Sequence, residues 1–301
     1  MSNHPIEFDR LTCYYGKHKA VDTLNLNIPE GQVTALLGRN GAGKTSAIRC
    51  LLGFQEPTRG TARLLGHDVR ALPYEVRGRV GYVAEAERLI PWMRVCDIVA
   101  YQRATFPTFD ADYCDQQMRR LQLPRRRRIG KLSRGMRAQL ALLLALAPRP
   151  ELLVLDDPAL GLDAAVRREF LEAMIDMIAD EGRTVLFTSH IISDVERVAD
   201  RVAILDQSVL RVDAPLDELK SRVRRWRAEF DGPPPSPPPL PGLIRSRPST
   251  NGLWLTATSS AESVRGAFQE LGATTVVDEP LALEDLFIDL THPQEAATCD
   301  R

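Results

Sequence analysis

The sequence Gly38-Arg39-Asn40-Gly41-Ala42-Gly43-Lys44-Thr45 fits the pattern G-x-x-x-x-G-K-[ST] of a glycine-rich phosphate loop. The apolar run before it, residues 33–37, predicts a buried strand, and residues 46–52 predict a helix. Glycines let the backbone turn tightly so that consecutive N–H groups face a phosphate, and the helix adds the positive end of its dipole. We therefore predict a nucleotide site in which Lys44 reaches the outer phosphates and the Thr45 hydroxyl binds Mg²⁺.

The composition is typical of a globular protein with a buried core, since 44% of the 301 residues are hydrophobic and 26% are charged. A net charge of −1 gives no overall attraction to nucleic acid, and no nucleic-acid partner is expected. The basic run Arg125-Arg126-Arg127-Arg128 is a local exception. Such a run can bind an anion, but a solvated loop is the simpler interpretation.

Cysteine usage favours a reducing cytosol, and the length of the longest apolar run predicts a chain that does not itself span a membrane. Five scattered cysteines without a C-x-x-C pair indicate neither a disulfide framework nor a zinc site. Residues 1–5 lack the basic and then apolar pattern of a signal peptide. The longest apolar run, residues 140–148, is far shorter than the ~20 residues of a membrane span.

Strand and helix patterns alternate through residues 1–220, which predicts an α/β fold with a mostly parallel sheet. A helical stretch at about residues 85–140 interrupts this alternation. Residues 221–301 predict a separate small α+β domain, with the proline-rich segment 233–241 as a stiff spacer. Asn251-Gly252 indicates a hairpin turn in this domain.

Three polar side chains follow apolar strands at positions where they can reach the phosphate loop. Asp156 ends the strand at residues 152–156 and is the expected Mg²⁺ ligand, while Asp157 is placed to orient a water for attack on the γ-phosphate. His190 follows the strand at residues 184–188 and should face the same crevice.

The order of these motifs resembles the ATP-binding subunit of an ATP-binding cassette (ABC) transporter over roughly residues 4–220. Four further matches carry the resemblance: the signature L-S-G-G-Q, the Walker B strand, the D-loop and the switch histidine. In this chain they read Leu132-Ser133-Arg134-Gly135-Met136, Leu155-Asp156-Asp157-Pro158, Gly161-Leu162-Asp163 and Thr188-Ser189-His190.

The resemblance implies a P-loop NTPase fold of the ABC type, with an antiparallel N-terminal β-subdomain and a helical subdomain at about residues 85–140. It implies that ATP contacts the phosphate loop and Ser46, and that Tyr15 stacks on the adenine. The alternative for Tyr15 is a core tyrosine, because Tyr14 is adjacent and one of the pair should face inward. Glu85 stands where the family usually has a glutamine, and it would contact Mg²⁺ or the attacking water.

Members of this family pair head to tail, so the resemblance implies that Ser133, Arg134 and Gly135 contact the ATP of a second subunit. Whether that subunit is identical stays open. A separate membrane permease is the other expected partner, and this places the chain on the inner face of the cell membrane. The resemblance places Glu85 and residues 89–93 where the helical subdomain contacts the membrane permease. Exposed Trp92 and Met93 would suit this contact, and the alternative is that both are buried in the subdomain. The sequence Leu283-Glu284-Asp285-Leu286-Phe287 resembles the ending of ABC-2-type exporter subunits and favours export.

Asp157 replaces the family's catalytic glutamate and is one methylene shorter. A displacement of this size can cost roughly 10²-fold in rate, so we expect a slow ATPase. Two alternatives remain open, namely an ATP-gated clamp or regulatory subunit with very weak hydrolysis, and a soluble ABC ATPase that acts outside transport. Against the latter, the chain has neither a long coiled coil nor a second cassette.

Overall fold

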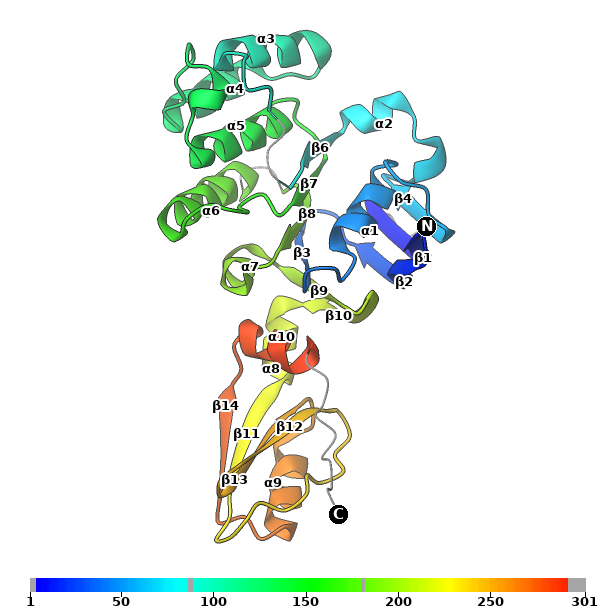
Figure 1. Ribbon diagram of the computed structural model, residues 1–301, viewed down its shortest axis with the longest axis vertical. Coiled ribbons are helices and arrows are strands. Elements are labelled where there is room, and N and C mark those ends of the chain that lie inside the picture. The colour runs from blue at the N-terminus through cyan, green and yellow to red at the C-terminus, as the bar shows by residue number, and fades with distance from the viewer. Residues whose placement is uncertain (1–3, 86–88, 180–181, 292–301) are drawn as a thin grey trace. The chain divides into compact units, whose positions relative to one another are not determined.

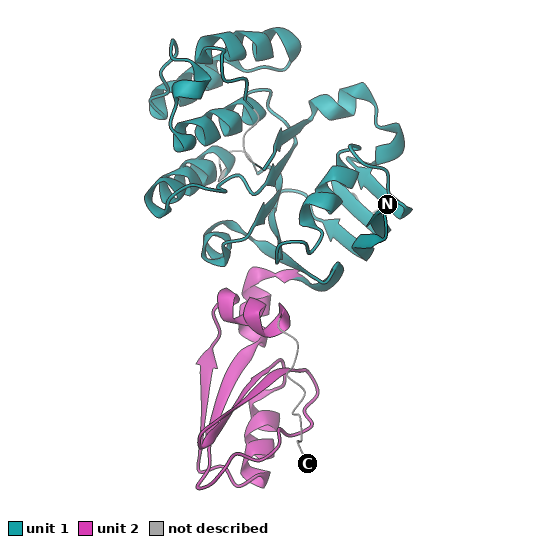
Figure 2. Cartoon of the chain, viewed as in Figure 1, with its two compact units in different colours: residues 1–213 teal, residues 214–301 magenta. Residues whose placement is uncertain are grey.

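The structure, a computed structural model, describes residues 4–85, 89–179 and 182–291. The chain forms two compact units, residues 1–213 and residues 214–301 (Figure 2). None of the helices in the described ranges combines the length and the apolar character that a membrane span requires.

The centre of the first unit is a six-stranded sheet. In spatial order it contains β10 (Val209–Pro215), β9 (Arg201–Asp206), β3 (Val33–Gly38), β8 (Thr184–Ser189), β7 (Leu152–Asp156) and β6 (Val80–Val83) (Figure 1). β3 pairs in parallel with β8 and β9, and β7 pairs in parallel with β6 and β8. Every residue of β7 and β8 is buried, as expected for central strands of a parallel sheet. The prediction of a mostly parallel sheet is confirmed.

A second sheet lies beside the first and is antiparallel, which confirms the expected N-terminal β-subdomain. Its order is β2 (His18–Ile28), β1 (Ile6–Tyr15), β4 (Arg59–Leu64) and β5 (His67–Asp68). Helix α1 (Lys44–Leu51) contacts strands of both sheets, and its residues Ala47, Ile48, Cys50 and Leu51 are buried in the core that the two sheets share. Packing on both sides therefore fixes the helix that begins at the phosphate loop.

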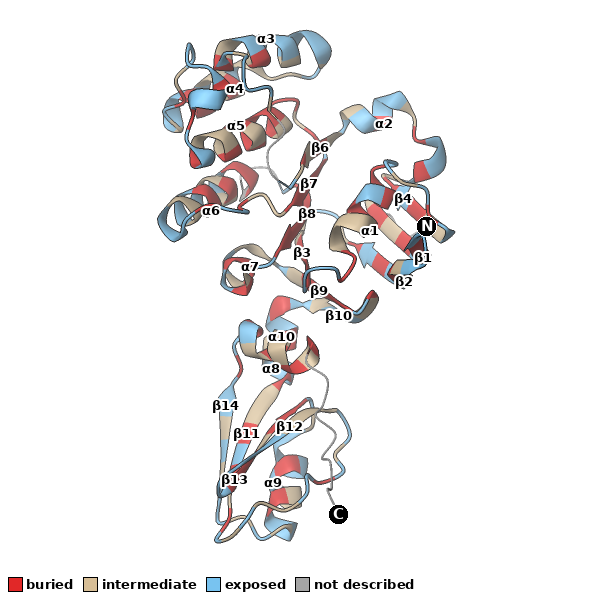
Figure 3. Ribbon diagram, viewed as in Figure 1, coloured by how far each residue is buried: buried red, intermediate tan, exposed pale blue. Residues whose placement is uncertain are grey.

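The remaining elements of the first unit are mainly helical. They are η1 (Val69–Ala71), α2 (Tyr74–Gly78), α3 (Val95–Thr105), α4 (Ala111–Arg120), η2 (Ile129–Lys131), α5 (Arg134–Leu146), α6 (Ala164–Ala179) and α7 (Ile192–Val198). Ser133 caps α5, because its side chain accepts a hydrogen bond from the backbone N–H of Met136. α5 packs against α4, α6 and β6, and all of its leucines are buried (Figure 3).

The second unit is an α+β fold around an antiparallel sheet. The sheet order is β12 (Leu243–Ser249), β13 (Gly252–Ala257), β11 (Arg224–Glu229) and β14 (Thr275–Pro280), and the helices are α8 (Leu216–Arg222), α9 (Ala261–Glu270) and α10 (Leu283–Thr291). Trp226, Leu255 and Phe268 form the centre of its core. The expected hairpin joins β12 to β13, but its turn is one residue earlier than predicted, because Ser249 pairs with Gly252.

Candidate functional site

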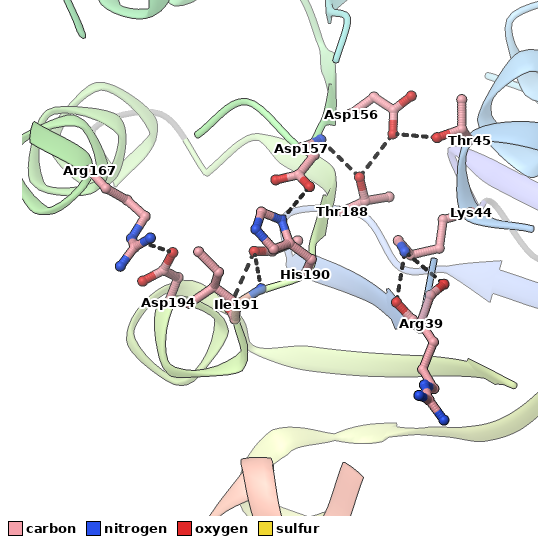
Figure 4. A network of polar contacts seen from close by, with 12 residues as sticks. Arg39, Lys44, Thr45, Asp156, Asp157, Arg167, Thr188, His190, Ile191 and Asp194 are labelled. Carbon is pink, nitrogen blue, oxygen red and sulfur yellow. Dashed lines mark hydrogen bonds and ion pairs between the residues drawn. The ribbon is translucent and has the colours of Figure 1, made fainter. Parts of the chain in front are cut away.

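The phosphate loop leaves the carboxyl end of β3 and runs into the first turn of α1. Gly43 closes it with a φ of +106°, and a Cβ on this residue would lie 2.2 Å from the carbonyl oxygen of Ala20. Only glycine fits there. Nζ of Lys44 donates to the carbonyl oxygens of Gly38 at 2.7 Å and Arg39 at 3.3 Å. The ammonium group is thus held at the mouth of the loop (Figure 4).

Burial lowers the pKa of Lys44, while the carboxylates of Asp157, Asp156 and Glu85 act in the opposite direction. A partly desolvated ammonium group is stabilised by nearby negative charge. The local electrostatics therefore favour an anionic ligand such as a phosphate at this position.

Asp156, the last residue of β7, is buried and lies between two hydroxyl groups. Its Oδ1 accepts hydrogen bonds from Oγ1 of Thr45 at 3.2 Å and from Oγ1 of Thr188 at 3.0 Å (Figure 4). Burial raises the pKa of Asp156, and these two hydrogen bonds oppose the rise. A carboxylate and a hydroxyl side by side are oxygen donors of the kind that Mg²⁺ prefers.

Asp157 is held in a left-handed conformation with a φ of +46°, which costs a non-glycine residue roughly 1 kcal/mol. Its backbone N–H donates to Oγ1 of Thr188 at 2.9 Å. Its Oδ2 lies 2.5 Å from Nδ1 of His190, so one carboxylate oxygen is engaged and Oδ1 is left for another partner (Figure 4). Burial raises the pKa of Asp157, and the contact with His190 opposes the rise.

One cavity of about 390 Å³ collects most of the predicted nucleotide-binding residues. Glu85 also lines it, at the end of the described segment 4–85. The lining comprises Tyr15, His18, Ala20, Asn40, Gly41, Ala42, Gly43, Lys44, Thr45, Ser46, Glu85, Asp156, Asp157 and Thr188. His190 joins this set through its contact with Asp157, and Gly38 and Arg39 join it through Lys44.

Tyr15 lines the cavity with 44% of its surface exposed, and its hydroxyl donates to Oε1 of Gln55. Tyr14 is also exposed, so the expectation that one of the pair faces inward is wrong. The regular alternation fails because the pairing register of β1 with β2 shifts between Cys13 and Tyr14. Tyr15 is therefore no core residue.

The signature residues Ser133, Arg134 and Gly135 are not brought into this cavity. They form the start of α5, and Nη1 of Arg134 donates to the carbonyl oxygen of Gly161 at 3.0 Å. A Cβ on Gly135 would lie 2.3 Å from Cγ1 of Val166 in α6, so this glycine permits close helix contact. The signature residues at the start of α5 therefore contact Gly161 and helix α6 of the same chain.

Thr188 is the functional residue that the sequence analysis missed as an individual group. It touches both acidic residues, donating to Asp156 and accepting from the N–H of Asp157. The strand register places it there, because Asp156 pairs with Thr188 across β7 and β8. The sequence did offer a signal for Thr188, namely a hydroxyl side chain near the end of a strand and two residues before His190.

Comparisons with known proteins agree with this geometry. The family model described as "ABC transporter" matches residues 21–160. The chain is 31% identical over 226 residues to "ABC transporter ATP-binding protein YtrB" of Bacillus subtilis, covering 75% of this chain and 77% of that protein. It is 29% identical over 301 residues to "Nod factor export ATP-binding protein I" of Paraburkholderia xenovorans, covering 97% and 98%. A solved "Structure of ATP binding subunit of ABC transporter" has a TM-score of 0.64 and 26% identity, covering 72% of this chain and 92% of that one.

Proposed function

The chain belongs to the ABC transporter family as an ATP-binding subunit with the fold of an ATPase, and from this premise we propose that it powers export through a separate membrane permease. The observation that carries the proposal is the meeting of the phosphate loop, Asp156 and the Asp157–His190 pair at the carboxyl ends of β3, β7 and β8. Export is supported by the relative named for Nod factor export, which aligns over nearly the whole chain, and by the sequence Leu283–Phe287.

In the proposed mechanism, Lys44 and the loop N–H groups bind the β- and γ-phosphates. Asp157 orients the attacking water through Oδ1 and accepts its proton, while His190 holds Oδ2 and so fixes the carboxylate. Tyr15 offers its exposed ring to the adenine. Residues 1–220 carry all of these groups, and we assign to residues 221–301 no part in the chemistry.

The residues present fit a magnesium ion. Oγ1 of Thr45 and Oδ1 of Asp156 are already 3.2 Å apart, and Glu85 lines the same cavity. Mg²⁺ is commonly bound in such sites by one or two side chains together with substrate phosphates. When bound, the ion neutralises charge that develops on the transferred phosphoryl group.

We further propose a head-to-tail dimer in which Ser133, Arg134 and Gly135 close the ATP site of a second subunit. The start of α5 is a helix N-terminus capped by Ser133, and helix N-termini favour anions. Arg134 adds an exposed positive charge at the same place. These groups lie outside the cavity of their own chain, which is why a second chain is needed.

Blocking hydrolysis should trap this dimer. We expect Asp157→Asn to form dimers with Mg-ATP, measured by light scattering, while the same protein without nucleotide stays monomeric. The amide keeps the shape of the carboxylate and spares ATP binding, so the closed state persists. A persistent monomer, even with the permease supplied, would count against the dimer.

A groove of about 960 Å³ in the first unit is the proposed docking site for the permease. Its apolar lining includes Ile90, Trp92, Met93, Ile98, Tyr101 and Phe106, and Glu85 and Asp156 also border it. Trp92 is 71% exposed and Met93 is half-buried, so the alternative that both are buried does not hold. A groove of this kind accepts an apolar helix face, and its border with Glu85 links it to the ATP site.

Truncating the exposed tryptophan should weaken this docking. We expect Trp92→Ala to reduce affinity for the permease by roughly 30-fold, because interface tryptophans often contribute about 2 kcal/mol or more. The measurement is co-purification or titration with the permease. Tyr74→Ala is the matched control, since Tyr74 is equally exposed but lies on α2 outside the groove lining. Equal affinity of Trp92→Ala and wild type would show that the contact is wrong.

Reconstitution tests the transport part of the proposal. The chain should be combined with the membrane protein that co-purifies with it, in vesicles supplied with Mg-ATP on the outside. We expect the permease to stimulate ATP turnover, and we expect no such stimulation when the phosphate-loop lysine is replaced. ATP turnover that no membrane protein alters would contradict the transport role while leaving the ATPase intact.

A further inference from the structure

The four-arginine run, Arg125–Arg128, is not a loose loop, because its backbone is held against the segment that begins α3. The N–H groups of Val95 and Cys96 donate to the carbonyl oxygens of Arg127 at 3.1 Å and Arg125 at 2.8 Å. Nη1 of Arg94 donates to the carbonyl oxygen of Arg126 at 3.0 Å. These contacts use the backbone of the run, so its side chains are not needed to hold it.

Among the described residues, three of these side chains have no opposite charge paired with them. Arg125 pairs with Asp115 at 2.6 Å, but Arg126, Arg127 and Arg128 have no carboxylate partner among the residues that the structure describes. All four arginines are exposed. Holding like charges together is unfavourable unless an anion screens them. The chain as a whole has a net charge of −1, so this is a local basic edge on a nearly neutral protein.

The basic edge borders the apolar groove. The N–H groups of Ile129 and Gly130 donate to the carbonyl oxygens of Met93 at 2.9 Å and Pro91 at 2.9 Å, and Met93 lines the groove beside exposed Trp92. If the groove receives the permease, as proposed above, this edge faces the membrane. We propose that Arg126, Arg127 and Arg128 bind the anionic phospholipid headgroups of that membrane surface.

Lipid fits the edge better than an acidic segment of the permease does. Cytoplasmic loops of membrane proteins carry an excess of Lys and Arg, so they are a poor source of negative charge. The cytoplasmic leaflet carries anionic lipids that attract basic segments close to the membrane. Trp92, next to the edge, is of a residue type enriched at the membrane–water boundary.

The test is co-sedimentation of the full chain with vesicles of phosphatidylcholine alone or mixed with phosphatidylglycerol. Wild type should sediment with the mixed vesicles, not with the neutral ones, and added salt should release it. The variant Arg126→Gln/Arg127→Gln/Arg128→Gln should bind the mixed vesicles about 100-fold more weakly. Glutamine leaves the backbone contacts of the run in place.

The matched control is Arg59→Gln/Arg63→Gln/Arg77→Gln, which removes the same charge from exposed positions elsewhere in the first unit. It should sediment as wild type does. Equal binding to neutral and mixed vesicles, no binding by wild type, or equal loss in both triple variants would each overturn the proposal. Loss of permease affinity in the first variant, without vesicle binding by wild type, would assign the edge to an acidic protein segment instead. ATP turnover of the wild type with the permease is measured separately, and its absence would reject the proposed function without deciding whether the basic edge binds lipid.

Discussion

Lys44→Ala is expected to weaken Mg-ATP binding by about 100-fold, because hydrogen bonds to a charged group contribute about 1.5–3 kcal/mol and the ammonium also supplies the positive charge at the phosphates. The structure places Nζ over the carbonyl oxygens of Gly38 and Arg39, at the mouth of the loop. Turnover should fall with binding. Titration of nucleotide, by calorimetry or by fluorescence of a labelled analogue, measures the change.

Arg49→Ala is the control for this variant, since Arg49 is an exposed cation on the same helix. It removes the same charge but does not line the nucleotide cavity. The backbone N–H groups of the loop remain in Lys44→Ala, so some affinity for ATP should persist. Unchanged affinity in a folded Lys44→Ala protein would reject the phosphate-loop assignment.

Asp157→Asn should remove hydrolysis and keep ATP binding, because an amide has nearly the shape of the carboxylate but cannot accept a proton. Loss of a general base costs roughly 10³-fold in rate. His190→Ala should act in the same direction, since its Nδ1 holds Oδ2 of Asp157 at 2.5 Å and its loss frees the carboxylate to turn. Steady-state phosphate release and nucleotide affinity, measured together, separate the two effects. Weakened ATP binding by Asp157→Asn would contradict this role.

The pH dependence follows from the same carboxylate. A general base works in its ionised form, and burial raises the pKa of Asp157. Protonation therefore begins at a higher pH than for an exposed aspartate, and turnover should fall as the pH is lowered through this raised pKa. The residual rate of Asp157→Asn should lack that acid limb.

Asp157→Glu tests whether the short side chain of Asp157 limits turnover. The close contact with His190 and the left-handed backbone of Asp157 suit the shorter side chain. We therefore expect the added methylene to lower turnover, by up to roughly 10²-fold. Higher turnover in Asp157→Glu would mean instead that Asp157 is a strained base that the longer side chain relieves.

The sequence predicted those parts of the site that depend on neighbouring residues. The strand, loop and helix around Lys44 are contiguous, and the ends of parallel strands meet at one edge, so Asp156 and His190 were expected near the loop. The parallel sheet could be predicted from the alternation of strands and helices, whereas the antiparallel N-terminal sheet was expected from the resemblance to ABC subunits.

What could not be predicted depends on register and on distant contacts. Thr188 lies between the two acidic residues because β7 and β8 pair in one particular register. The two tyrosines are both exposed because the register of β1 with β2 shifts between Cys13 and Tyr14, which breaks the alternation. Arg134 reaches the carbonyl oxygen of Gly161, 27 residues along the chain, and no local pattern indicates this.

Phosphate release from the wild type, with Mg-ATP and the permease present, tests the central claim most directly. Asp157→Asn is measured beside it, with bound ATP quantified in both proteins. We predict slow but measurable release from the wild type and release at the background rate from the variant, at equal ATP binding. Equal ATP binding with no phosphate release from the wild type would contradict the account and leave an ATP-gated clamp.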